Sequence, residues 1–163
     1  MTDINRFTNY AQELLASANT VVQSHNNTEM QPEHIMLAMI KDGGAIKDYL
    51  TELKLLNQSF IDKIIAYINN FPKISGLQNS QQLFLSSYTN MLIDIANKTA
   101  TELKDEFISA EVLLLSMTKL DNSNIQKILS DFGVNQNKIL SVMKKLRGNK
   151  KVDNKNAEEN MKA

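Results

Sequence analysis

Few residues of this chain have the types and spacing that catalysis or metal binding requires. The only histidines are His25 and His34, neither stands in a His-Glu-x-x-His frame, and the sequence has no cysteine. A zinc site needs several such ligands and thiol catalysis needs a cysteine, so the sequence predicts no catalytic residue and no metal site. We expect His34, which follows Pro32-Glu33, to be a partly exposed residue in the first turn of a helix.

A phosphate-binding loop is also absent from the sequence. No Gly-x-x-x-x-Gly-Lys-Ser/Thr segment occurs in the 163 residues, and such a segment supplies the N–H groups and the hydroxyl that hold a nucleotide and its Mg²⁺. We therefore expect residues 1–163 to have no enzymatic activity and to bind no cofactor.

Two acidic side chains are stronger candidates for a functional role. Glu33 and Glu111 are both predicted to lie in the first turn of a helix, where the positive end of the helix macrodipole stabilises a negative charge by about 0.3–1 kcal/mol. Thr8 suits the N-cap position in front of a helix, because its hydroxyl can accept a backbone hydrogen bond. Helix capping alone would explain all three residue types.

The elements that position these residues come from an internal duplication. Residues 85–119 repeat residues 7–41 in a constant register, which continues beyond them after a one-residue slip. The coincident pairs include Tyr10 and Tyr88, Ala18 and Ala96, Glu33 and Glu111, Leu37 and Leu115, Met39 and Met117, Ile46 and Ile125, and Leu50 and Leu129. A single unit is too small to bury its apolar face, so we expect two units packed about a pseudo-two-fold axis, with a groove where they meet.

The composition excludes several classes of protein. Lys plus Arg and Asp plus Glu both number 18, so the formal net charge is zero, and there is no basic field to hold nucleic acid. No apolar run approaches the roughly 18 residues that span a bilayer, and the first residues have no signal-peptide pattern. We expect a soluble, cytoplasmic protein with no nucleic-acid or membrane partner.

Apolar residues recur at helical spacing along most of the chain. The expected helix ends are marked by side chains that can cap a helix, by Pro32, and by Gly43-Gly44 and Gly133. The sequence therefore predicts an all-α fold of two tandem four-helix repeats, eight helices in total. The first repeat (about 4–70) has predicted helices at about 7–25, 32–42, 45–53 and 58–70, and the second (about 81–148) at about 86–103, 109–119, 124–132 and 136–147.

Two segments do not follow this pattern. Residues 71–80 contain Pro72 and Gly76 and are predicted to be a linker between the repeats. Apolar periodicity vanishes after Gly148, so we expect residues 149–163 to be a mobile polar tail.

Four apolar residues precede the two long helices. Phe7 stands before the first, and Leu83, Phe84 and Leu85 stand before its counterpart. Such residues either staple the first turn of a helix or line the groove between the repeats, and the staple is the favoured interpretation.

Three separated segments resemble the signatures of a known family. Ile4-Asn5-Arg6-Phe7-Thr8, the stretch from Met30 to Ile40 and the stretch from Phe107 to Leu114 are similar to the repeats of the double Clp N-terminal domain, which stands at the front of hexameric AAA+ unfoldases. The resemblance covers essentially the whole chain.

Two further segments are similar to one branch of that family. Phe71 to Gly76, and Met143 to Gly148 followed by Val152, Ala157 and Glu158, resemble the ClpB disaggregases more closely than the protease-partnered relatives. The resemblance places the domain at 1–148 and implies that 149–163 begin a flexible linker to an ATPase module.

The resemblance implies a function that composition and spacing do not show. It implies a domain that binds unfolded or aggregated polypeptides and passes them to an ATP-driven threading ring. For the full-length protein it implies ATP and Mg²⁺, a homohexamer formed by the ATPase modules, and cooperation with the DnaK chaperone system. We expect residues 1–163 alone to be monomeric.

The resemblance also singles out three polar residues. Positions equivalent to Thr8, Asp105 and Glu111, which we call the polar cluster, are tied to substrate handling in the family. Substrate handling and helix capping remain alternative interpretations for these residues. An adaptor-docking domain that binds one folded partner is the alternative function, whereas a stand-alone enzyme has no supporting residues.

Overall fold

The computed structural model describes residues 4–74 and 83–161. These residues are helical, and their only β-pairing is a set of isolated bridges. The predicted all-α fold is confirmed. Its elements are η1 (Ile4–Arg6), α1 (Asn9–Ser24), α2 (Pro32–Lys41), α3 (Ala45–Glu52), α4 (Gln58–Asn70), α5 (Ser87–Glu102), α6 (Ala110–Met117), α7 (Asn124–Asp131), α8 (Gln136–Arg147) and α9 (Ala157–Met161).

Helices begin where the sequence offers a capping side chain. Thr8 Oγ1 accepts a hydrogen bond from Ala11 N at 3.1 Å, and Ser86 Oγ accepts one from Thr89 N at 3.0 Å. Asn57 and Asn135 cap α4 and α8 in the same way. These side chains satisfy N–H groups that have no partner within their helices, so local chemistry fixes the starts of four helices.

Backbone pairing between the repeats follows the register of the duplication. Phe7 pairs with Ile108, and their counterparts Leu85 and Met30 pair in the same parallel manner. The residues just before α1 and α5 are therefore each hydrogen-bonded to the other repeat, as a pseudo-two-fold axis requires.

Backbone conformation repeats in the same register. Asn26 and Lys104, which coincide before the slip in the alignment, have φ of 56° and 63°. Lys54 and Gly133, which coincide only after the slip, have φ of 58° and 80°. The backbone therefore reproduces the one-residue slip inferred from the sequence.

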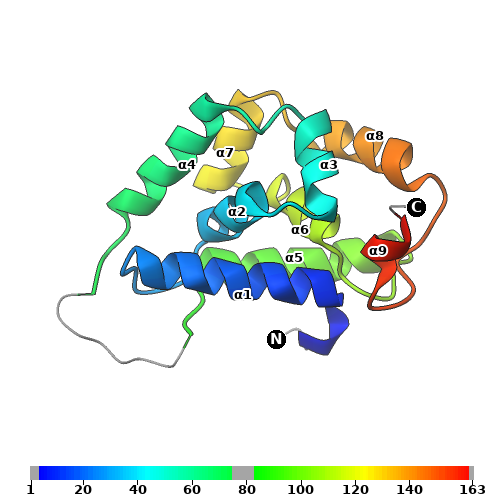
Figure 1. Ribbon diagram of the computed structural model, residues 1–163, viewed down its shortest axis with the longest axis horizontal. Helices are drawn as coiled ribbons and strands as arrows, with labels where there is room; N and C mark the ends of the chain where they lie inside the picture. The colour runs from blue at the N-terminus through cyan, green and yellow to red at the C-terminus, as the bar shows by residue number, and fades with distance from the viewer. Residues whose placement is uncertain (1–3, 75–82, 162–163) are drawn as a thin grey trace.

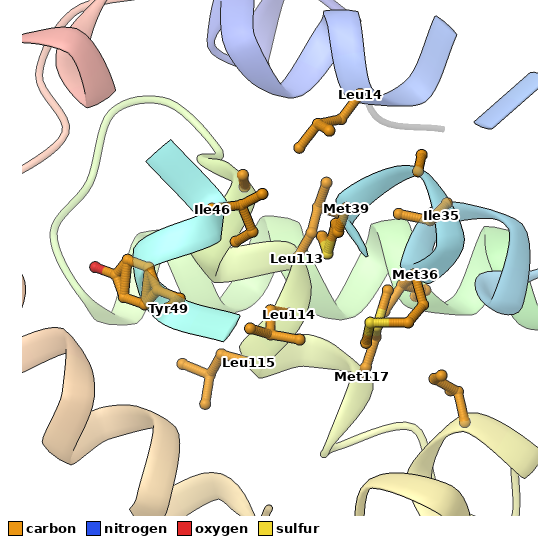
Figure 2. Close-up of a cluster of buried hydrophobic side chains, with 14 of the residues drawn as sticks. Leu14, Ile35, Met36, Met39, Ile46, Tyr49, Leu113, Leu114, Leu115 and Met117 are labelled. Carbon is orange, nitrogen blue, oxygen red and sulfur yellow. The ribbon is translucent and has the colours of Figure 1, made fainter. Parts of the chain in front are cut away.

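The short apolar helices α2 and α6 form the centre of the molecule (Figure 1). The long helices α1 and α5 pack against them from one side, α4 packs on α2, and α8 packs on α3 and α6. Figure 2 shows how side chains of α1, α2, α3 and α6 meet in one buried cluster, which includes Leu14, Met39, Ile46 and Met117. Met39 and Met117, which coincide in the duplication, are both fully buried.

The residues after Gly148 differ from the prediction of a mobile tail. Val152 and Ala157 are buried, and α9 lies beside the beginning of α1 (Figure 1). Asn9 N donates a hydrogen bond to Lys155 O at 2.9 Å, and Glu106 N donates one to Val152 O at 2.8 Å. We call residues 150–159 the C-terminal strap. Its order comes from long-range hydrogen bonds, which apolar periodicity does not reveal.

The prediction of a partly exposed His34 was wrong. Its ring is fully buried, Nδ1 accepts a hydrogen bond from Gln31 N at 2.8 Å, and Nε2 lies 2.8 Å from Asn27 Oδ1. Burial lowers the pKa of His34 to about 4, assisted by the charge of His25. His34 is therefore neutral at pH 7 and closes the loop that precedes α2.

Part of the predicted linker at 71–80 can be described. Ile74 N donates a hydrogen bond to Asn26 O at 2.8 Å, and Phe71 packs against the core. Residues 75–80 lie outside the described residues.

Candidate functional site

Thr8 is fully buried and has two roles in the structure. Its hydroxyl caps α1 and also donates a hydrogen bond to Glu158 Oε2 at 2.8 Å. The same oxygen of Glu158 accepts a hydrogen bond from Ala110 N, the first residue of α6, at 3.1 Å. The carboxylate of Glu158 therefore bridges the N-terminal ends of two helices that belong to different repeats.

Glu158 is held in an unfavourable environment for a charge. The residue is 4% exposed, and its second oxygen, Oε1, is buried without a hydrogen-bond partner. Burial, together with the negative charge of Glu111, raises the pKa of Glu158 to about 7. Near neutral pH this carboxyl group therefore lies close to its titration midpoint.

Asp105 and Glu111 are joined by one cation, Arg147 at the end of α8. Arg147 Nε donates to Glu111 Oε2 at 2.8 Å, and Nη2 lies 3.0 Å from Asp105 Oδ2. Nη2 also donates to Ser109 Oγ at 3.1 Å, and Asp105 Oδ1 accepts a hydrogen bond from Val152 N at 3.0 Å. Asp105 thus connects the buried ion pair to the C-terminal strap.

The ion pairs of Arg147 are largely shielded from water. The side chains of Arg147, Asp105 and Glu111 are 6%, 0% and 4% exposed. Burial alone would lower the pKa of Arg147, but the charges of Glu111 and Asp105 raise it above its ordinary value. Removing one partner of such a group leaves an uncompensated buried charge, at a typical cost of about 3–5 kcal/mol.

The first repeat has no equivalent ion pair. Glu33, the counterpart of Glu111, is 4% exposed, and burial raises its pKa to about 7. Among the described residues, no salt bridge to Glu33 is found. The duplicated glutamates thus share a helix position but differ in electrostatic environment.

A surface opening of about 200 Å³ lies beside the buried charges. It is lined by Ala45, Asp48, Tyr49, Glu111, Leu146, Arg147 and Glu158. Burial raises the pKa of the Tyr49 hydroxyl, with a further contribution from Glu111, so this hydroxyl stays protonated. The opening offers carboxylates and a hydroxyl next to small apolar surfaces.

The structure brings the three members of the polar cluster together from both repeats. Arg147 joins Asp105 to Glu111, and Glu158 joins Thr8 to the backbone next to Glu111. Capping accounts for only part of this arrangement, because Asp105 lies before α6 and binds the strap. All three members are nearly inaccessible to solvent.

The four apolar residues that precede the long helices, and that the sequence singles out, lie in three different environments. Phe7 is buried in the core, and Leu85 is half-buried against it. Leu83 and Phe84 are instead 43% and 51% exposed. The staple interpretation therefore does not account for Leu83 and Phe84, whose side chains remain available for contact.

Sequence reasoning missed Arg147 and Glu158 as members of the site. Arg147 stands in the last turn of a helix, where a cation is common for reasons of helix polarity alone. The register of the duplication carried one signal, because after the slip it aligns Arg147 with Ile68, a buried position of α4. A charged residue at a position that is apolar in the other repeat indicates a buried partner.

The profile described as the Clp repeat (R) N-terminal domain matches residues 6–159. The chain belongs to this family. The match extends through the whole of the C-terminal strap, in agreement with the packing of that segment. The resemblance seen in the sequence is therefore confirmed.

Relatives of this Clp N-terminal domain include longer chaperones. The chain is 30% identical to chaperone protein ClpB 2 of Nostoc sp. over 157 residues and 29% identical to chaperone protein ClpB of Vibrio cholerae. Each match covers 96% of this chain and 18% of the relative. The chain thus spans about a fifth of the length of these relatives.

Solved structures share the fold at lower identity. The Hsp104 N-terminal domain from Candida albicans superposes with a TM-score of 0.71 at 21% identity, covering 93% of this chain and 98% of that one. The N-terminal domain of the ClpV1 ATPase from E. coli gives 0.67 at 19% identity, covering 85% and 83%. These likenesses establish the fold.

Two further observations on the described residues concern metal binding and membrane spanning. No group of three or more His, Asp or Glu side chains among them is arranged to hold a metal ion. No helix within 4–74 or 83–161 is both long enough and apolar enough to cross a bilayer.

Proposed function

We propose that this domain recruits unfolded or aggregated polypeptides for the ATP-driven threading ring of a ClpB-type disaggregase. Membership of the Clp N-terminal family and the chaperone names of its relatives support the general role. The observation that carries the proposal is a concentration of exposed apolar side chains at the beginning of α5.

Four large apolar side chains that are close together in the sequence define what we call the α5 patch. Among the described residues five large hydrophobic side chains are exposed, and four of them fall within residues 83–91. They are Leu83, Phe84, Tyr88 and Met91, with exposures of 43%, 51%, 37% and 47%. Exposed apolar groups that cluster in this way are typical of surfaces that bind polypeptide.

The patch combines a fixed backbone with adaptable side chains. The carbonyl of Phe84 accepts a hydrogen bond from Met30 N at 2.8 Å, so the segment before α5 is anchored to the first repeat. Tyr88 and Met91 are three residues apart and share a helix face. A flexible thioether such as that of Met91 suits a surface that must accept many sequences.

The polar cluster supports the same function indirectly. Thr8, Asp105 and Glu111 are at most 3% exposed, so they offer a bound polypeptide very little contact surface while the strap is in place. We infer that they act as positioning residues, whereas Leu83 and Phe84 contact the polypeptide. Phe7 contributes through the core.

Substitutions in the patch test the proposal. Phe84→Ser should weaken binding of a reduced and alkylated model polypeptide about tenfold or more, because burial of a Phe side chain contributes roughly 1.5–3 kcal/mol. Leu56→Ser is the matched control, since Leu56 is 38% exposed but lies between α3 and α4. Fluorescence anisotropy titrations of both variants measure the effect.

Two results would overturn the proposal. Equal losses for Phe84→Ser and Leu56→Ser would remove the α5 patch from the binding surface. Binding of one folded cytosolic protein in the absence of any unfolded-chain binding would favour the adaptor-docking function.

The assembly of the whole protein follows from the same proposal. We infer a cytoplasmic homohexamer that cooperates with the DnaK system, with ATP and Mg²⁺ bound by ATPase modules beyond these residues. Six tethered copies of the domain would raise the effective concentration of weak sites and give avidity without further contacts. A phosphate-binding loop in the sequence that follows Ala163 would test this assignment.

A further inference from the structure

The C-terminal strap contacts both repeats through a small number of polar contacts. In the first repeat, Thr8 donates to Glu158, and Asn9 donates to Lys155 O at 2.9 Å. In the second repeat, Asp105 accepts from Val152 N, and Ala110 N donates to Glu158. The strap therefore spans the junction between the duplicated units.

The apolar contribution of the strap is small and separate from the main core. Val152 and Ala157 are its buried apolar side chains, and neither belongs to the core cluster that fills the two repeats. Lys151, Asp153 and Asn154 are exposed. Segments with few apolar contacts open at lower free energy than the core, because their opening sacrifices little buried surface.

We propose that the C-terminal strap is a releasable element, fastened to the two repeats by Thr8 and Asp105, which opens without unfolding the helical core. The fastened state holds residues 150–159 against the N-terminal ends of α1 and α6. The released state uncovers Thr8 and the Ala110 N–H, next to the opening lined by Glu111 and Arg147.

Glu158 weakens the fastened state. Its Oε1 atom is buried without a hydrogen-bond partner, whereas water would solvate both oxygens after release. Burial and the charge of Glu111 also raise the pKa of this carboxyl group to about 7. An ionised Glu158 therefore favours release.

Release has a mechanical consequence that rests on the proposed function. If an ATPase module follows this domain, ten freed residues would add up to about 33–36 Å of reach to the connection. Thr8 and Asp105 would then affect substrate delivery, because they would set the length of the connection to the ATPase module and the point on the domain where it starts.

Hydrogen exchange of the intact 163-residue chain tests whether the strap opens separately. We expect the Val152 amide to exchange at least about tenfold more slowly than in an unstructured peptide, yet much faster than amides in α2. Exchange as slow as that of α2 would show that the strap opens only with the core. Unprotected exchange would show that it is not fastened. Either result would overturn the proposal.

Two variants test the fastening contacts, one at Thr8 and one at Val152, the strap residue whose N–H donates to Asp105. Thr8→Val and Val152→Asp should each speed exchange of residues 150–159 by about tenfold or more, the effect expected when a hydrogen bond to a charged group or a buried contact is lost. Protection of α2 should remain. Ser86→Ala is the matched control, because Ser86 caps α5 in the same way as Thr8 caps α1 but does not contact the strap.

If the strap amides exchange at the same rate in Thr8→Val and Ser86→Ala, Thr8 acts only as a helix cap, and its fastening role is overturned. Polypeptide titrations of the same variants separate this proposal from the previous one. If the wild-type chain binds no unfolded polypeptide, the recruiting function fails, whereas the exchange data still decide whether the strap is releasable.

Discussion

Arg147 stands in α8 at the position that Ile68 occupies in α4 of the first repeat. Both residues are buried, with exposures of 7% and 0%. The duplicated units therefore share a backbone but differ in the chemistry at this buried position. Replacing an apolar residue by arginine is tolerated only where carboxylates surround it, and here Asp105 and Glu111 supply them.

Arg147→Met should destabilise the domain by about 3–5 kcal/mol, because it leaves two buried carboxylates without their cation. Urea denaturation monitored by circular dichroism measures the free energy of unfolding. Lys145→Met is the matched control on the same helix, since Lys145 pairs with Glu52 on the surface, with the side chains 64% and 36% exposed. Exposed pairs contribute about 0–1 kcal/mol. A loss at Arg147 no larger than that at Lys145 would contradict the buried ion pair.

At the scale of elements, the C-terminal strap carries a carboxyl group that lies among other charged and titratable side chains. Glu158 experiences the charge of Glu111 of α6, and it lines the same opening as Arg147 of α8 and Asp48 and Tyr49 of α3. Tyr10 of α1 also experiences the charge of Glu158. Arg147 is already occupied by Asp105 and Glu111, so the strap carboxylate receives little compensation from it.

Strap opening should therefore depend on pH. The pKa of Glu158 is about 7 when the strap is fastened and near 4.5 when it is released. The fastened state then binds the proton more tightly, so its stabilisation is complete below pH 4.5 and is lost as the pH rises through 7. We expect opening of the strap, measured by exchange corrected for intrinsic rates, to increase on the order of a hundredfold across this range.

Glu158→Gln should flatten this dependence, because glutamine does not titrate. Glu33→Gln provides the control, since Glu33 has the same pKa of about 7 but lies in α2, away from the strap. A strap that opens equally at pH 5 and pH 8 in the wild-type chain would contradict the assignment.

The contrast between helices and strap explains what the sequence could predict. Helix starts follow from local chemistry, as with Thr8, Ser86 and Asn57, and burial follows from periodic apolar residues such as Met39 and Met117. The strap is ordered by contacts such as Thr8 with Glu158, which are far apart in the sequence. No local pattern encodes such a pair.

The candidate site was predicted only in part for the same reason. Thr8, Asp105 and Glu111 could be grouped from family resemblance, and the structure places them together. The groups that connect them, Arg147 and Glu158, come from segments whose local sequence suggests a helix end and a polar tail. His34 was misjudged because its burial depends on Asn27 and Gln31, which lie in the preceding loop.

At the scale of the whole molecule, charge and exposed apolar surface have separate locations. The net charge is zero, and the buried ion pairs among the described residues lie around Arg147. The α5 patch is apolar and lies in the second repeat at residues 83–91. Recruitment through this patch would rely on burial of apolar surface, and long-range electrostatic attraction would contribute little.

Binding of unfolded polypeptide should accordingly change little between low and physiological salt. Screening shortens electrostatic interactions to about 10 Å at 0.1 M ionic strength, but it does not weaken apolar contacts, and sulfate should strengthen them. Anisotropy titrations of an uncharged and a highly charged unfolded polypeptide, each at several concentrations of NaCl and of sodium sulfate, measure the dependence. Both polypeptides should bind with affinities that stay within about threefold in NaCl and rise in sulfate. A steep loss of affinity with NaCl for both would show that charges outside the α5 patch drive recruitment, because apolar contacts alone produce no such slope.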